Sequence, residues 1–164
     1  MNRTLRNDVD LRFNQLSLFA LLLWAGMVAG ISFLEAPLKF TAPQVTLAIG
    51  LGIGRLVFSW LNKVELVLGA LVVFGLFFNR PPFRIWLPVL LLLGVLMLQT
   101  TWLLPALDAR ALQIMAGRIP QPSYFHLVYV TLEIFKLGLL LGAASAVYHY
   151  QFVPAPARRQ AVMN

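Results

Sequence analysis

The chain has 164 residues, of which 60% are apolar and 12% are charged, and its net charge is +7. A soluble domain carries about twice that charged fraction, so the composition favours an integral membrane protein over a soluble globular one. The absence of cysteine excludes disulfides and thiolate metal sites. Most Lys and Arg residues lie at the ends of apolar segments, so we attribute the positive charge to contact with lipid headgroups. The partner predicted from composition is therefore the lipid bilayer, and we expect no nucleic acid.

The first apolar segment follows a polar N-terminal tail, residues 1–14, which carries charges of both signs. The segment itself, Leu16–Leu34, is close to the ~20 residues of a membrane span and longer than the roughly 7–15 of a signal peptide. We therefore predict a retained first span. Pro37 is expected to end or kink the helix. Glu35 and Lys39 are four residues apart and are expected to pair.

The next apolar run, residues 44–78, is too long for a single span and is interrupted by polar residues. We predict a break, with a short interfacial or tilted helix over Gln44–Phe58 and a second span over Trp60–Phe78. Polar side chains recur through this region at helical spacing and so share one helix face. They are Arg55, Ser59, Asn62 and Glu65.

A third span is predicted over Ile85–Leu104, after a basic, proline-rich turn at residues 79–84. Pro105 is expected to close it. In the polar connection that follows, Asp108 is expected to cap a short amphipathic helix over Ala109–Ala116.

The fourth predicted span, about Phe125–Tyr148, carries a second polar stripe at helical spacing. A carboxylate in a segment otherwise suited to lipid costs roughly 2.5–3.5 kcal/mol on insertion scales, so Glu133 must face protein or water. The tail at residues 153–164 has no apolar pattern and is expected to be disordered. The stripe consists of His126, Tyr129, Glu133 and Lys136.

These segments predict an all-α polytopic membrane protein, a four-transmembrane-helix bundle over residues 15–152 with a short interfacial helix before the second span. Four spans place both termini and the basic turn on one side. That side carries seven Lys or Arg residues and the other side carries three to five. The positive-inside rule then predicts cytoplasmic termini, and we expect a bacterial inner membrane.

Under this topology the polar parts of all four spans lie in the outer half of the bilayer, which predicts a single polar cluster. One interpretation is an ion-pair network, in which Arg55 and Lys63 neutralise Glu65 while Lys136 neutralises Glu133. Another is a site that binds or passes a small solute, ion or proton. The expected members are Glu35, Arg55, Asn62, Glu65, Gln99, His126, Tyr129, Glu133 and Lys136.

A metal-dependent enzyme is a third interpretation, with Glu65, His126 and Glu133 as weak candidate ligands. His126 and Glu133 are seven residues apart, which is not the Glu-x-x-His spacing of bundle di-metal sites. His126 and His149 lie roughly 35 Å apart on one helix, too far to share a haem. The sequence contains no hydrolase, phosphate-loop or dinucleotide motif. The cofactor therefore stays open, and a role without catalysis is favoured.

Two glycine pairs with GxxxG spacing, Gly26 with Gly30 and Gly138 with Gly142, allow close helix approach. We expect these glycines to serve helix packing. They suit a homo-oligomer, or a chain that is an accessory subunit of a larger membrane complex.

Three stretches together suggest a family. The first span contains Trp24-Ala-Gly26 and runs into Phe33-Leu-Glu-Ala-Pro37; a glycine-containing helix feeds the second span; and Trp102-Leu-Leu-Pro105 precedes a basic link and His126. This pattern resembles a family of small four-helix membrane proteins typified by transmembrane protein 205, which includes uncharacterised bacterial proteins. The resemblance implies a four-span bundle and a role in handling or resisting small toxic solutes. It implies no catalytic residues.

Overall fold

The structure is a computed structural model that describes residues 3–152, and throughout that range the only regular secondary structure is helical. Four helical runs are long and apolar enough to cross a membrane, which confirms the predicted all-α four-helix membrane architecture. These runs are Gln15–Thr41, Leu47–Asn79, Phe83–Met115 and Phe125–Gln151.

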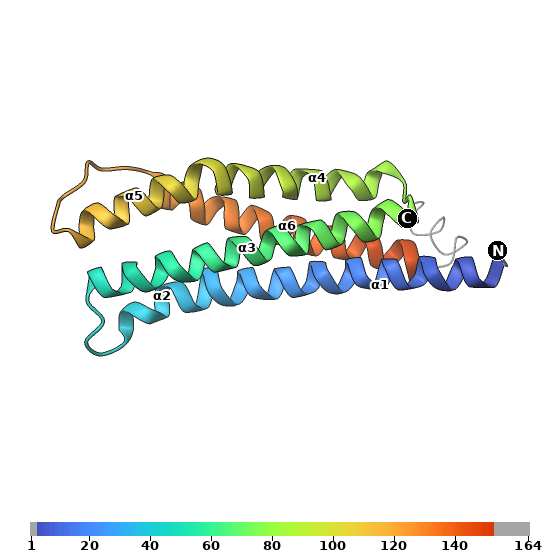
Figure 1. The fold of residues 1–164 in the computed structure, drawn as a ribbon, viewed down its shortest axis with the longest axis horizontal. Helices are drawn as coiled ribbons and strands as arrows, with labels where there is room; N and C mark the ends of the chain where they lie inside the picture. Colours follow the sequence, from blue (N-terminus) through green and yellow to red (C-terminus); the bar gives the residue numbers. More distant parts are fainter. Residues whose placement is uncertain (1–2, 153–164) are drawn as a thin grey trace, which may run out of the picture.

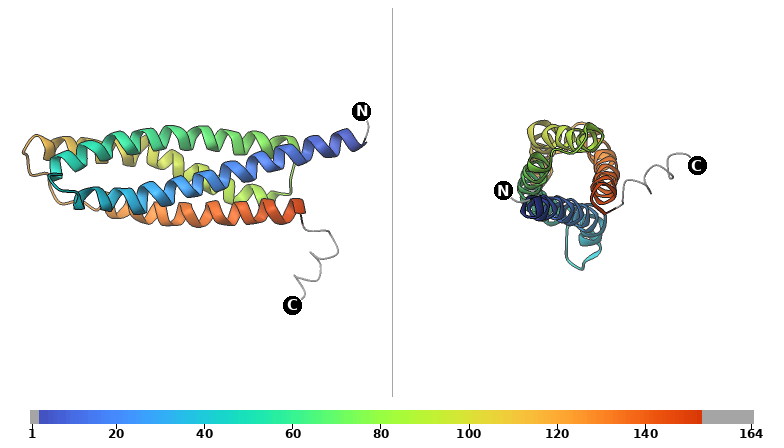
Figure 2. Two further views of the ribbon diagram at one scale, coloured as in Figure 1. Left: turned by 90° about the horizontal axis from the view of Figure 1, so that it is seen from below. Right: turned by 90° about the vertical axis from the view of Figure 1, so that its right-hand side faces the viewer.

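The bundle runs up and down, so that consecutive runs are antiparallel (Figure 1). The long helices are α1 (Arg3–Val28), α3 (Leu47–Asn79), α4 (Phe83–Leu98) and α6 (Phe125–Phe152). Seen end-on, they stand at the corners of a square in the order α1, α3, α4, α6, so that α3 and α6 are diagonal partners (Figure 2). The start of α1, the end of α6 and the α3–α4 turn share one end.

The predicted break in the second apolar run is wrong, because residues 47–79 form the single helix α3. Its 33 residues span about 50 Å at ~1.5 Å per residue, more than the ~30 Å thickness of a hydrocarbon core, so the helix is longer than a span requires. Thr46 caps the helix, since its hydroxyl accepts a hydrogen bond from the Ile49 N–H.

Prolines widen two of the helical runs rather than ending them. The run from α1 continues through the π-helix η1 (Ala29–Glu35), α2 (Ala36–Leu38) and the short 3-10 helix η2 (Lys39–Thr41). The run from α4 continues through the π-helix η3 (Gln99–Leu103) into α5 (Leu104–Met115). A proline clashes with the carbonyl four residues before it, and a π turn opens the helix just ahead of Pro37 and Pro105. The prediction that Pro105 closes the third span is therefore wrong.

The predicted flanking segments have different outcomes. Residues 3–14 already belong to α1, where a polar tail was predicted. The helix predicted over Ala109–Ala116 exists, but as part of α5, and it ends just before Gly117, whose positive φ of 73° suits a residue without a Cβ. The predicted disordered tail at 153–164 lies outside the described residues.

Close helix contact uses other glycines than the two GxxxG pairs. A Cβ built at Gly26, Gly30, Gly138 or Gly142 meets nothing within 4 Å, so these glycines do no packing within the described chain. The tight crossing of α1 and α3 is at Gly75, where a built Cβ lies 2.1 Å from Ser17 Oγ and 2.8 Å from the Phe13 carbonyl oxygen. Small residues let membrane helices approach closely, and here that approach sets the α1–α3 spacing.

Gly75→Ala is accordingly expected to destabilise the protein by about 1–3 kcal/mol, because a backbone carbonyl cannot move aside as a side chain can. The measurement is unfolding of the full chain in mixed micelles of mild detergent and SDS. Gly94→Ala on α4 is the matched control, since a Cβ there meets nothing within 4 Å. Equal midpoints for the two variants would contradict the packing argument.

Candidate functional site

Three charged side chains meet in the centre of the bundle. Lys136 on α6 places its Nζ 2.6 Å from Glu65 Oε1 and 2.6 Å from Glu133 Oε1. Lys136 and Glu133 are 0% exposed and Glu65 is 3% exposed. We call Glu65, Glu133 and Lys136 the buried triad. Breaking a buried ion pair by removing one partner costs about 3–5 kcal/mol, so these three groups depend on one another.

Neutral donors complete the coordination of both carboxylates. The Trp24 indole N–H donates to Glu65 Oε1 at 2.8 Å. Gln99 Nε2 donates to Glu133 Oε1 at 2.9 Å, and the Ser32 hydroxyl donates to Glu133 Oε2 at 2.6 Å. All four helical runs therefore contribute to the buried triad or its hydrogen bonds.

The two π turns are what bring Ser32 and Gln99 to Glu133. Ser32 lies in η1 and Gln99 lies in η3, each a few residues before the proline that widens the helix. A π turn shifts the angular register of the side chains that follow, and such turns are frequent at functional sites. Each proline thus accompanies a π turn that positions one donor for Glu133, Pro37 with Ser32 and Pro105 with Gln99.

The buried triad also crosses the bundle. Glu65 comes from α3 and Lys136 from α6, which stand at diagonal corners of the square (Figure 2). The Phe58 and Tyr129 rings link the same two helices edge to face at 5.4 Å. The hydroxyl end of Tyr129 lies next to Ser32 and Glu133.

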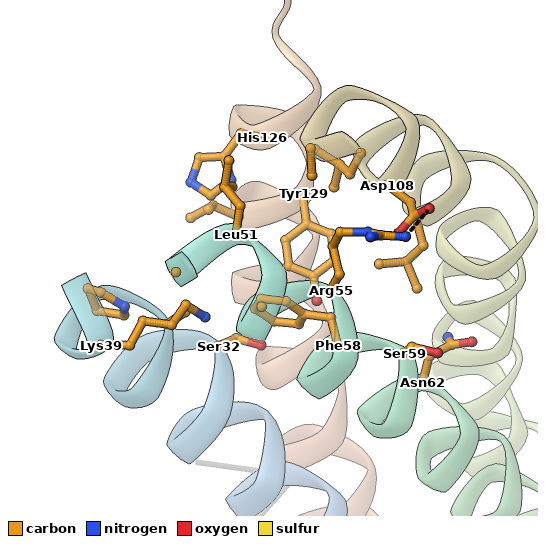
Figure 3. A pocket seen from close by; sticks show the side chains of 18 of the residues that line it. Ser32, Lys39, Leu51, Arg55, Phe58, Ser59, Asn62, Asp108, His126 and Tyr129 are labelled. Carbon is orange, nitrogen blue, oxygen red and sulfur yellow. Dashed lines mark hydrogen bonds and ion pairs between the residues drawn. The ribbon is translucent and has the colours of Figure 1, made fainter. Parts of the chain in front are cut away.

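A cavity of about 970 Å³ lies directly beside the triad, at the end of the bundle opposite the start of α1. Ser32, Asn62 and Tyr129 line it, and Ser32 at the same time bonds to the triad. Figure 3 shows His126 and Tyr129 of α6 facing Leu51, Arg55 and Phe58 of α3 across it. The remaining wall is mainly apolar, from Phe33, Phe40, Leu104, Leu107 and Val130.

Ion pairs and hydrogen bonds close the sides of the cavity. Arg55 on α3 donates to both oxygens of Asp108 on α5, at 2.5 and 3.0 Å (Figure 3). Lys39 pairs with Glu35 at 3.3 Å, which confirms that expectation, and its Nζ lies over the Phe58 ring. Asn62 Nδ2 donates to Thr100 Oγ1 at 2.8 Å, joining α3 to η3.

The predicted ion pairs are confirmed at Glu133 and wrong at Glu65. Lys136 pairs with Glu133 at the expected spacing, but Lys136 also neutralises Glu65 in place of Arg55 and Lys63. Arg55 lies ten residues from Glu65, about 15 Å along the helix, and so cannot reach it. Lys63 is two residues away on a different face, and its Nζ lies 4.3 Å from the centroid of the Trp60 ring.

The single predicted cluster is divided in two. One part is buried and holds the triad and Gln99, while the other lines the cavity and holds Arg55, Asn62, His126 and Tyr129. Glu35 belongs to neither and pairs with Lys39. Among the described residues no three or more His, Cys, Asp or Glu side chains gather where they could hold a metal, so Glu65, His126 and Glu133 do not form the metal site considered from the sequence.

Several residues of the site were missed by sequence reasoning. Trp24 and Ser32 are single polar donors in apolar helices, and no local pattern marks them. Asp108 was interpreted as a helix cap, although an acid ahead of an amphipathic helix can equally serve a distant arginine. Lys39 was predicted only to pair with Glu35, and neither Lys39 nor Thr100 was expected to line a cavity.

Asp108→Asn is expected to cost no more than about 1 kcal/mol of stability, because the Arg55–Asp108 pair is partly exposed. Its larger effect is expected on access, since the pair ties α3 to α5 at the wall of the cavity. The measurement is the rate at which a water-soluble thiol reagent labels a single cysteine at Ser59 in this cysteine-free chain. Faster labelling in Asp108→Asn supports the prediction, and an unchanged rate contradicts it.

Comparison with known proteins gives no relative. No family model, no curated protein and no solved structure matches this chain. The resemblance to the transmembrane protein 205 family stays a prediction, and the function has to be argued from the site.

Proposed function

We propose that this protein is a membrane-embedded binding protein for a small solute, with the cavity between the η1–η2 segment, α3, α5 and α6 as its binding site. The observation that carries the proposal is the continuity of cavity and triad, because Ser32 lines the first and bonds to the second. Ionisable residues within membrane spans commonly mark substrate or ion pathways.

The composition of the cavity supports a small, partly apolar ligand. Its volume of about 970 Å³ falls at the upper end of the ~300–1,000 Å³ range of small-molecule sites. Such sites combine apolar walls with a few polar groups that orient the ligand. Here the apolar side chains surround Asn62, Tyr129 and the Arg55–Asp108 pair.

Native mass spectrometry of the full chain in mild detergent tests this proposal. Ser59→Trp places an indole in the cavity, and Val67→Trp on the same helix is the matched control, since Val67 is 60% exposed and does not line the cavity. We expect a small molecule to be retained by the wild type and by Val67→Trp and lost in Ser59→Trp. Equal retention by both variants, or none by the wild type, would refute the proposal.

We propose the inner membrane of a bacterium as the location, with both chain ends in the cytoplasm. The sequence count supports this orientation, with seven Lys or Arg residues on the side of the termini and the basic turn against three to five on the other side. A single cysteine at Ile119, which is 98% exposed in the α5–α6 connection, should react with a membrane-impermeant reagent added to intact cells. A single cysteine at Phe83, at the start of α4, should react only after lysis.

An accessory-subunit role is the second candidate. It is supported by the two GxxxG pairs, one in the helical run that begins with α1 and one in α6, where a built Cβ meets nothing within 4 Å. These glycines are therefore available for close contact with a helix of another protein. Co-purification of a second membrane protein that is lost in Gly26→Leu/Gly30→Leu would favour it. A pure homo-oligomer would count against it.

A further inference from the structure

We propose that the buried triad holds one exchangeable proton, delivered from the cavity through the Ser32 and Tyr129 hydroxyls. Two carboxylates and one ammonium leave a net charge of −1 at 0–3% exposure. An uncompensated charge in such surroundings costs several kcal/mol, and taking up one proton removes it.

Within the part of the chain whose side chains the structure describes, no other charged side chain supplies the compensation. No further salt bridge there reaches the triad, and the donors facing it from α1, η1 and η3 are the neutral Trp24, Ser32 and Gln99. Of the cations that line the cavity, Lys39 is paired with Glu35 and Arg55 with Asp108. The third, Lys63, is exposed and its Nζ lies over the Trp60 ring, away from the triad. His126 is exposed at the cavity, and Tyr129 is neutral when its hydroxyl is protonated.

An unpaired oxygen points to the same conclusion. Gln99 is 1% exposed, its Nε2 donates to Glu133, and its Oε1 has no hydrogen-bond partner. A buried acceptor without a donor costs about 1–3 kcal/mol. A protonated carboxyl, or a water that relays the proton, supplies the missing donor.

The path of the proton follows from the residues that contact both the cavity and the triad. Ser32 and Tyr129 line the cavity, Ser32 donates to Glu133 Oε2, and the Tyr129 hydroxyl lies beside both. A hydroxyl can accept one proton while it donates another. A proton from cavity water is therefore taken up by a hydroxyl oxygen as that hydroxyl releases its own proton to Glu133, and the reverse sequence returns it.

Infrared spectroscopy of the full chain in liposomes tests the proposal directly. At neutral pH we expect the carbonyl-stretch band of one protonated carboxyl per chain, with the shift in D₂O that marks an exchangeable proton. Glu65→Gln and Glu133→Gln should each abolish the band, because the remaining carboxylate is then neutralised by Lys136. Glu35→Gln is the control that should retain it, and Ser32→Ala should slow the exchange.

The outcomes separate clearly. A wild-type spectrum with no protonated carboxyl from about pH 5 to about pH 9 overturns the proposal without any variant having to fold. A band that persists in both Gln variants overturns it as well, as does a band that disappears when sodium is added, which would make the site a cation site. The inference rests on the same cavity as the proposed function. No solute is added in the infrared experiment, so a missing protonated carboxyl and a failure to bind solute are separate results.

Discussion

Lys136→Met is expected to lower the free energy of unfolding by about 3–5 kcal/mol, because removing one partner of a buried ion pair leaves the other charge uncompensated. Methionine fits the volume of the lysine stem but leaves two carboxylates 0–3% exposed without their shared cation. Lys136 also joins the diagonal helices α3 and α6 through its ion pair with Glu65, so its loss weakens the centre of the bundle. The measurement is unfolding of the full chain in mixed SDS micelles.

Lys63→Met is the control for this prediction. Lys63 is exposed, forms no described salt bridge and lies over Trp60, so its replacement should change stability by no more than about 0.5–1 kcal/mol. If Lys136→Met and Lys63→Met unfold at the same fraction of SDS, the triad contributes little to stability and the argument from buried charge fails. A Lys136→Met/Glu133→Gln double variant is expected to recover part of the loss, since one carboxyl group fewer is left buried without the lysine.

Trp24→Ala is expected to cost about 3–5 kcal/mol, the second large effect. The Trp24 side chain is 0% exposed and packs against Gly69 of α3, where a built Cβ would lie 3.5 Å from the indole ring. Its N–H also supplies one of the hydrogen bonds to Glu65. Alanine therefore leaves both a cavity between α1 and α3 and a carboxylate with one donor fewer.

Two further variants divide the effect of Trp24 into its parts. Trp24→Phe keeps most of the ring and removes the N–H, so it should cost about 1–3 kcal/mol. Trp102→Ala is the control, because Trp102 is 48% exposed. The same mixed-micelle titration is used for all three. A loss in Trp102→Ala as large as in Trp24→Ala would contradict the packing argument.

The membrane character and the helical architecture follow from the sequence alone. Four apolar stretches of about 20 residues or more leave the backbone no solution in lipid other than helices, because every N–H and C=O must be paired within its own segment. Local spacing also determined the Glu133–Lys136 and Glu35–Lys39 pairs, since residues three or four apart on a helix are neighbours.

Helix ends were less well determined by the sequence. Prolines and polar residues were interpreted as breaks after Leu104 and near Ser59, yet the helical runs continue to Met115 and Asn79. At Pro105 the π turn relieves the clash. In α3 the polar residues are accommodated without a break, because Asn62 bonds to η3 and Glu65 to α6. A local signal for a break is therefore overridden by partners on other helices.

The partners across the bundle were decided only by the tertiary structure. Lys136 reaches Glu65 across 71 residues of sequence, and Ser32 reaches Glu133 across 101. A helix periodicity gives the direction of a side chain relative to its own axis, but not which helix stands opposite. The order of helices around the square placed Lys136 between two carboxylates, and this arrangement turns two polar stripes into a buried triad beside a cavity.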